Sequence, residues 1–377
     1  MSEWKKVLAE DYCDSVRDGT HDTPKRVENG FKLVTGKHIK GGIIDHSSAY
    51  FISEDDYNAI NVRSKVHQWD VLMSMIGTVG EVAIVKTIPD YAIKNIALFK
   101  CEGNEIKAKW LYYFLSSPIT QGALHGNLKG SSQQFLSLKQ IRNLPISVPN
   151  EEVMLRIVKV LSRYDSLIEN YQKQIKLLEE AAQRLYKEWF IDLHFPGHEN
   201  TNIVDGVPEG WEKKSVTDVL EIKYGKDHKL LKDGTIPVYG TGGVMRYVEK
   251  NLYTGESVLI PRKGSLNNIL LVNGTFWTID TMFYSIQKED NVAKIVYFFL
   301  KGVDMYSFNI GAAVPSMTVN ILSGMKLLIP KCNTRKEFEN IVSTFYNRIQ
   351  SLQSQLCLLT EARDRLLPKL MSGAIEV

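Results

Sequence analysis

The sequence has few cysteines and no long hydrophobic stretch. Four cysteines stand among 377 residues, with wide spacing and no CxxC pair: Cys13, Cys101, Cys332 and Cys357. This pattern does not indicate a zinc site and is typical of a reducing compartment. No apolar run reaches the roughly 18–20 residues that a membrane helix needs, and the N-terminal MSEWKKVLAEDY lacks the apolar core of a signal peptide. We therefore expect a cytoplasmic protein that does not insert into a membrane.

Several catalytic motifs are also missing. The chain has no GxxxxGK[ST] phosphate-binding loop and no NPPF/Y- or DPPY-like strand end, with which amino-methyltransferases hold a flipped base. Its eight histidines show no paired metal-ligand spacing. We therefore expect no metal site, no cofactor and no catalytic residues in this chain.

One pattern resembles a metal-dependent nuclease. Pro89-Asp90 and Glu105-Ile106-Lys107 fit the loose PD…ExK spacing, which needs its carboxylates and lysine on adjacent strands around a metal. Asn104, however, is a favourable N-cap, and Glu105 would lie in the first turn of the helix that follows. We therefore interpret the segment as a helix start.

Composition indicates an ordinary globular protein. Hydrophobic residues make up 44% and charged residues 24% of the chain. A length of 377 residues favours two domains over one. The net charge of +3 permits nucleic-acid binding but does not demonstrate it.

Two long segments, at about 151–190 and 334–371, share one apolar period. Positions spaced 4-3-4-3 in the first recur 181 residues later in the second, and nine of ten are again apolar, with Arg363 as the break. A 3.5-residue period over more than four heptads predicts a coiled-coil seam. The predicted seam residues are Ile157, Leu161, Tyr164, Ile168, Tyr171, Ile175, Leu178, Leu185, Phe338, Val342, Phe345, Ile349, Leu352, Leu356, Leu359 and Leu366. The shared register favours pairing of the two helices with each other; the alternative is two separate helices, each packed on its own domain.

A strand-rich region precedes each long helix. Short β-type runs broken by Gly, Asn and Pro occur at 70–76, 80–86, 95–100, 257–261, 268–273 and 281–287. The two regions also match each other: amphipathic helices are predicted at 109–116 and 294–301, and proline-closed strands at 144–149 and 325–330. The predicted order is a globular region at 1–149, a helix at 150–192, a linker at 193–210, a globular region at 211–332 and a helix at 333–377.

Six local strings, together with this order, resemble one known family. They are RDGTHDTPK at 17–25, GTVGEVAIVK at 77–86, VPEGWEK at 207–213, PVYGTGGVM at 237–245, PRKGSL at 261–266 and RLLPKLMSGA at 365–374. The chain is similar over essentially its whole length to the specificity subunits of type I restriction–modification systems. One departure is at 265–268, where SLNN lacks the second glycine of the equivalent GTVG at 77–80.

The resemblance implies an α+β fold with a pseudo-twofold internal repeat. Two target-recognition domains would alternate with two long spacer helices that pair antiparallel as a coiled coil. The function implied is that of a non-catalytic, sequence-specific DNA-binding subunit, which reads a bipartite, asymmetric double-stranded target in DNA methylation and phage defence. The implied partners are two methyltransferase subunits, which use S-adenosylmethionine, and two restriction subunits, which use ATP and Mg²⁺.

Candidate DNA contacts are polar or basic residues in glycine-rich loops, where the backbone can approach phosphates and side chains can reach base edges. In the first globular region they are Arg17, Thr20, His21, Lys25, Arg26, Thr78, Ser131, Ser132, Gln133 and Gln134. In the second they are Lys226, His228, Tyr239, Thr241, Arg246, Arg262, Lys263, Ser265, Asn267 and Asn268. Basic residues barely outnumber acidic ones in each region, so any basic surface must be local.

Two other functions stay open from the residues alone. The chain could be a nuclease or single-chain methyltransferase, which a methyl-transfer assay on the lone chain would test. It could also be a coiled-coil scaffold whose globular ends bind proteins. Sequence-selective DNA binding would distinguish a DNA reader from such a scaffold.

Overall fold

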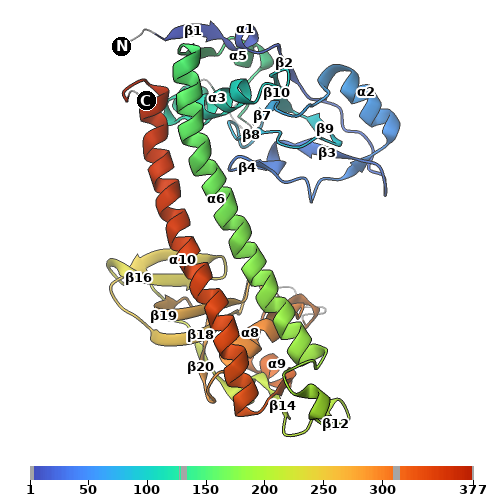
Figure 1. The fold of residues 1–377 in the computed structure, drawn as a ribbon, viewed down its shortest axis with the longest axis vertical. Helices are drawn as coiled ribbons and strands as arrows, with labels where there is room; N and C mark the ends of the chain where they lie inside the picture. The colour runs from blue at the N-terminus through green and yellow to red at the C-terminus, as the bar shows by residue number, and fades with distance from the viewer. Residues whose placement is uncertain (1–3, 127, 129–133, 309–314, 376–377) are drawn as a thin grey trace. The chain divides into compact units, whose positions relative to one another are not determined.

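The computed structural model describes residues 4–126, 128, 134–308 and 315–375 (Figure 1). The chain divides into two compact units. The first contains Met1–Tyr171 and Gln355–Val377, and the second contains Gln172–Ser354. Two long helices, α6 (Glu151–Tyr186) and α10 (Cys332–Met371), each contribute one part to each unit.

The first unit contains a strand-rich domain that we call the first head. Its four-stranded antiparallel sheet has the order β2 (Ser15–Asp18), β10 (Ile96–Lys100), β7 (Val71–Ser74) and β8 (Val82–Ile84). A three-stranded sheet has the order β6 (Phe51–Ile52), β3 (Phe31–Thr35) and β9 (Tyr91–Lys94), with β3 parallel to β9. Two strand pairs are β1 (Lys5–Leu8) with β11 (Pro145–Val148), and β4 (Ile39–Lys40) with β5 (Ile43–Ile44). Its helices are α1 (Ala9–Tyr12), η1 (Gly36–His38), α2 (Glu54–Ser64), α3 (Glu105–Ser116), α4 (Pro118–Gly126) and α5 (Leu138–Arg142).

The second unit contains the second head. Its six-stranded sheet has the order β15 (Leu220–Tyr224), β20 (Met282–Gln287), β18 (Tyr253–Pro261), β19 (Leu270–Thr278), β16 (Asp233–Gly240) and β17 (Gly243–Val248). Two strand pairs are β14 (Glu212–Ser215) with β21 (Lys326–Ile329), and β12 (Ile203–Val204) with β13 (Val207–Pro208). Its helical segments are η2 (Lys187–Ile191), η3 (His198–Asn200), α7 (Val216–Val219), α8 (Ala293–Lys301), η4 (Met305–Phe308) and α9 (Val319–Gly324).

The internal repeat is visible in the topology of the two heads. The sheet order β2-β10-β7-β8 recurs as β15-β20-β18-β19, and the pair β1–β11 recurs as β14–β21. In both heads one strand joins in parallel: β3 pairs with β9, and β16 pairs with the end of β19. The predicted strands and both amphipathic helices, α3 and α8, are confirmed.

The stretch 193–210, expected to be an irregular linker, has local structure of its own. It contains η3 and the short hairpin of β12 and β13. The hairpin turns at Asp205-Gly206, whose φ values of 50° and 74° are both positive. An Asp-Gly pair between apolar residues is a strong hairpin signal, so the sequence carried this information.

Within each unit the two long helices pack side by side and antiparallel (Figure 1). In the first unit, Leu161 near the start of α6 shares a core with Leu370 near the end of α10. In the second unit, Tyr186 at the end of α6 shares a core with Phe338 near the start of α10. None of the sixteen predicted seam residues, all of them described, is exposed. Off-register leucines are exposed instead: Leu155, Leu167, Leu177 and Leu358.

Arg363, the break in the apolar register, is accommodated by a polar cluster in the first unit. Its Nη1 lies 3.1 Å from Asp165 Oδ1, and the Tyr113 hydroxyl donates to Asp165 Oδ2 at 2.6 Å. Burial and the Asp165 carboxylate raise the pKa of Tyr113, so this hydroxyl remains a donor at neutral pH. The residue 181 positions before Arg363 is Ala182, which is fully buried. The two halves of the seam therefore use different chemistry at corresponding positions.

The seam is tested by a pair of leucines six residues apart on α6. Leu161 is fully buried, whereas Leu167 is 44% exposed. We expect Leu161→Ala to lower the free energy of unfolding by about 2–5 kcal/mol, because it removes core contacts and leaves a cavity. Leu167→Ala should change the free energy of unfolding by about 0.5 kcal/mol or less. Urea unfolding followed by circular dichroism measures both, and equal losses would contradict the seam assignment.

Candidate nucleic-acid interface

In both heads a glycine directly follows the first strand of the larger sheet, β2 in the first head and β15 in the second. A Cβ on Gly19 would lie 2.4 Å from a backbone carbonyl oxygen, and one on Gly225 would lie 2.0 Å from another. Neither approach is compatible with a side chain. The backbone N–H groups of these glycines donate to equivalent carbonyl oxygens, those of Ile96 and Met282, at 2.9 and 3.0 Å. The chain therefore leaves the sheet along the same path in both heads, and the loops that follow occupy corresponding positions.

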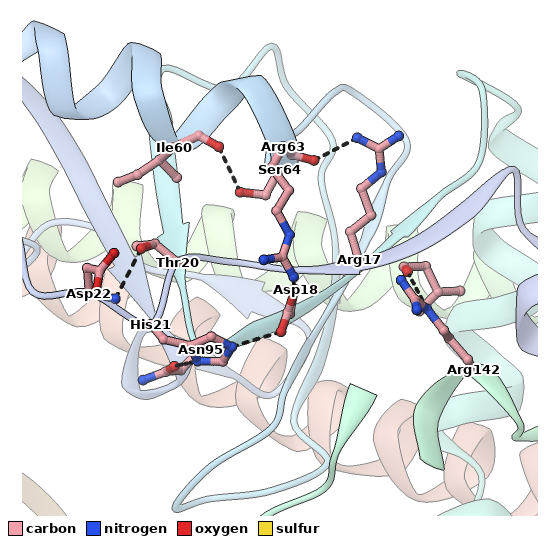
Figure 2. A network of polar contacts seen from close by, with 11 residues as sticks. Arg17, Asp18, Thr20, His21, Asp22, Ile60, Arg63, Ser64, Asn95 and Arg142 are labelled. Atoms are coloured by element: carbon pink, nitrogen blue, oxygen red, sulfur yellow. Dashed lines mark hydrogen bonds and ion pairs between the residues drawn. The ribbon is translucent and has the colours of Figure 1, made fainter. Parts of the chain in front are cut away.

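In the first head, a buried carboxylate organises this loop (Figure 2). The side chain of Asp18 is only 6% exposed; its Oδ1 pairs with the guanidinium of Arg63, and its Oδ2 lies 2.9 Å from His21 Nε2. His21 Nδ1 lies 2.7 Å from Asn95 Oδ1, and Arg17 donates to the carbonyl oxygen of Arg63 at 2.7 Å. Arg17 and His21 were predicted as contacts, and here they are held in an ordered cluster whose outer surface is solvent-exposed.

Three members of this cluster were missed by the sequence analysis. Asp18 stands within RDGTHDTPK, directly before Gly19. An acidic residue in this otherwise polar and basic string could have indicated a partner for the basic residues. Arg63 lies in the last turn of α2 and Asn95 lies between β9 and β10, so neither belongs to a motif. Their position beside Asp18 follows only from the fold.

The remaining candidates of the first head form two groups. Lys25 and Arg26 are exposed on the loop after His21, and the Arg26 guanidinium lies 4.8 Å from the ring centroid of Tyr50. Thr78 and Gln134 come together, because the Gly77 N–H donates to the carbonyl oxygen of Gln134 at 3.2 Å. The predicted contacts Ser131, Ser132 and Gln133 lie outside the described residues.

The loop at 264–267 of the second head lacks the second glycine of its counterpart at 77–80, but it begins with the same turn. Gly77 and Gly264 both have φ of 78°, and each carbonyl oxygen accepts the N–H two residues later at 2.9 Å. Gly80 has φ of 91°, whereas its counterpart Asn267 is not among the residues with positive φ. The Asn267 amide instead donates to Asp304 Oδ1 at 3.0 Å. A side-chain bond therefore holds the loop at the position where the first head has a second glycine.

Several predicted contacts in the second head hold the protein together. Arg262 lies over Tyr224, with 4.6 Å from Cζ to the ring centroid, and donates to the Asp280 carbonyl oxygen at 2.7 Å. Arg246 pairs with Asp233 at 2.7 Å.

One further contact of this kind involves an amide side chain, and two other candidates are partly buried. Asn268 donates to the carbonyl oxygen of Thr241 at 2.7 Å, which ties two candidate loops together. Tyr239 and His228 are half-buried, and burial raises the pKa of Tyr239. The exposed candidates of this head that make no such contact through their side chains in the described structure are Lys226, Lys263 and Ser265.

The segment with the nuclease-like spacing is the start of a helix. Asn104 caps α3 by accepting from the Lys107 N–H at 2.9 Å, so Glu105 begins a helix as predicted. Within the described residues, no group of three or more His, Cys, Asp or Glu could hold a metal ion. In the same part of the chain, no helix is both long and apolar enough to cross a membrane.

Comparison with known proteins gives a consistent result. The profile of a family described as type I restriction modification DNA specificity domain matches residues 1–180 and 208–358. The type I restriction enzyme MjaIX specificity subunit of Methanocaldococcus jannaschii is 25% identical over 342 residues, which cover 81% of this chain and 78% of that protein. The EcoBI specificity subunit of Escherichia coli is 23% identical over 187 residues, 46% of this chain and 39% of that protein.

The fold also matches a solved structure. The crystal structure of a type I restriction–modification S subunit from M. genitalium superposes with a TM-score of 0.63 at 18% identity, and the match covers 98% of this chain and 96% of that one. With the family profile matched over most of its length, this chain belongs to the DNA specificity subunits of type I restriction–modification systems, the non-catalytic components of those enzymes.

Proposed function

We propose that the two heads read two unlike halves of a bipartite, asymmetric DNA target. The observation that carries this proposal is one scaffold present twice with different residues at corresponding loop positions. Thr20 corresponds to Lys226, and Ile76 to Lys263, because the flanking glycines and backbone bonds are equivalent. Since base identity is read by side chains at base edges, unlike loops predict unlike half-sites.

The heads also differ in what is added to the shared scaffold. Between β3 and β7 the first head carries β4, β5, β6 and the helix α2, whereas between β16 and β18 the second head carries only β17. These additions would change the shape of each reading surface. The proposal thus assigns specificity both to the unlike residues at shared loop positions and to the elements that each head has alone.

The proposed partners are two methyltransferase subunits and, in a larger complex, two restriction subunits. S-adenosylmethionine, ATP and Mg²⁺ would bind to those partners. The exposed leucines outside the seam, Leu155, Leu167 and Leu177 on α6 and Leu358 on α10, support docking of a partner on the outer faces of the helices. The chain would then direct the catalytic subunits to the sequence that its heads read.

Exchange of one head tests the proposed modularity. Residues 1–148 would be replaced by the first head of another family member, and the hybrid co-expressed with the methyltransferase subunit. We expect one half of the methylated motif to change, while the other half and the spacing between them persist. Mapping methylated adenines in the genome gives the readout, and the reciprocal exchange of residues 211–332 is the control. If either exchange altered both halves, the heads would not be independent readers.

The neighbouring basic residues Arg262 and Lys263 should respond differently to truncation. Lys263→Ala should weaken DNA binding of the assembled complex, by about 1–3 kcal/mol if the lysine contacts a base. If it contacts a phosphate, the slope of log affinity against log salt should fall by about 0.9.

Arg262→Ala should mainly lower the stability of the second head, because its guanidinium packs on Tyr224 and bonds to a backbone carbonyl. Lys213→Ala, which removes an exposed charge from β14, is the matched control for Lys263→Ala. Equal effects of these two lysine variants on affinity and salt slope would contradict a specific role for Lys263.

A further inference from the structure

The loop between β15 and β16 in the second head carries an unusual side chain. Residues 225–232 read GKDHKLLK, and Leu230 is 98% exposed, the highest value among the exposed large hydrophobic residues of the described chain. A single exposed leucine is common on protein surfaces and has no meaning alone. Two further observations, the fixed conformation of the loop and its charge, give this one a meaning.

Both ends of the loop are bonded to the sheet. Trp277 Nε1 donates to the carbonyl oxygen of Lys226 at 2.9 Å, and the Glu249 N–H donates to that of Lys232 at 3.1 Å. Next to the exposed leucine, Leu231 is half-buried and packs against the small core that contains Trp277. The loop is therefore anchored on both sides of Leu230.

The turn between these anchors is also held by hydrogen bonds. Asp227 Oδ1 accepts the Lys229 N–H at 3.0 Å, and the Leu231 N–H donates to the His228 carbonyl oxygen at 3.1 Å. The Arg246 guanidinium donates to the carbonyl oxygen of Leu231 at 3.0 Å. The backbone on both sides of Leu230 is thus held in place, so ordering of the loop would cost little entropy on binding.

The charge of the loop matches a polyanion. Lys226, Lys229 and Lys232 are all exposed, and Asp227 is the one acidic residue of 225–232. The carboxylate of Asp227 accepts the hydrogen bond from the Lys229 N–H that holds the turn, and this bond lowers the pKa of Asp227. The loop therefore carries three lysines and one carboxylate. Three lysines around one apolar side chain fit a ligand with regularly spaced phosphates and an apolar interior.

We propose that Leu230 is a DNA-contacting residue of the second head, whose side chain is buried against the apolar surface of a base pair while the flanking lysines bind phosphates. This inference rests on the proposed function of that head as a DNA reader. Two parts of DNA offer such a surface: the faces of a base step, when an apolar wedge partly unstacks it, and the thymine methyl group in the major groove. In the first head, the corresponding loop after Gly19 instead presents His21, which is bonded to Asp18.

The test compares leucine variants in the complex of this chain with its methyltransferase subunits. Binding is measured on a duplex that contains the methylated motif mapped for the wild type. We expect Leu230→Ser to weaken binding about 10- to 100-fold, because the burial of a leucine is lost, with no change in salt slope. Leu230→Met should stay within about threefold, since it keeps an apolar side chain of similar volume. Val204→Ser, at another exposed apolar position of the second unit (68% exposed), should bind as the wild type does.

Labelled duplexes then identify which part of the DNA is contacted. A rise in 2-aminopurine fluorescence at one step of the second half-site, absent with Leu230→Ser, would indicate a wedge. A loss of affinity on replacing one thymine by uracil, also absent with Leu230→Ser, would indicate a methyl contact. Either result supports the proposal, and Lys229→Ala should independently reduce the salt slope by about 0.9.

Three outcomes would overturn the proposal. Leu230→Ser could bind as the wild type does, or it could weaken binding while neither label responds. It could also dissociate the methyltransferase subunits, which would make Leu230 a protein contact. Failure of the wild-type complex to bind its methylated motif selectively would instead refute the proposed function itself, and the two failures are therefore distinguishable.

Discussion

The packing of α6 against α10 is the interaction on which both units depend. The core of the first head continues into Ile157 and Leu161 of α6 and Leu370 of α10, and the core of the second head includes Tyr186 and Phe338. The core of each head is therefore completed by residues from both long helices, which are far apart in the sequence. A lesion in the seam should destabilise a head as well as the helices, because the same side chains serve both.

The duplicated scaffold preserves backbone constraints more strictly than side-chain chemistry. Gly19 and Gly225 occupy positions where a Cβ would meet a carbonyl oxygen, and Gly77 and Gly264 share one positive φ. At positions without such a steric requirement the two copies differ. The polar pair of Arg363 and Asp165 corresponds to a buried alanine and Tyr346 in the other unit. The points at which the loops leave the sheet are the same in both heads, whereas the side chains on the loops differ. Two heads with different side chains on these loops can therefore share one scaffold.

The seam, the strand-rich heads and the caps were predictable because each depends on local period or local turn chemistry. The 3.5-residue spacing identified positions that are all buried or half-buried, and Asn104 was correctly interpreted as an N-cap. The roles of individual loop residues were not predictable in the same way. Asp18 and Arg63 are 45 positions apart, and the contact of Arg262 with the ring of Tyr224 also joins residues far apart in the sequence. Basic residues in a loop carry the same sequence signal whether they bind DNA or a neighbouring carbonyl group. Only the fold shows which neighbouring groups such a residue contacts.

The electrostatic design of the heads bears on how specificity arises. Basic and acidic residues are nearly balanced over the whole chain, with a net charge of +3, so the general attraction to DNA phosphates is weak. The three exposed lysines of 225–232 concentrate positive charge in one anchored loop, and Arg17 and Arg63 lie together beside Asp18. Non-specific binding increases with the number of phosphates neutralised, whereas discrimination between sequences depends on base contacts. In a DNA-binding protein with few, local charges, the contribution of phosphate contacts is small. A larger share of the binding free energy then depends on contacts with the correct bases.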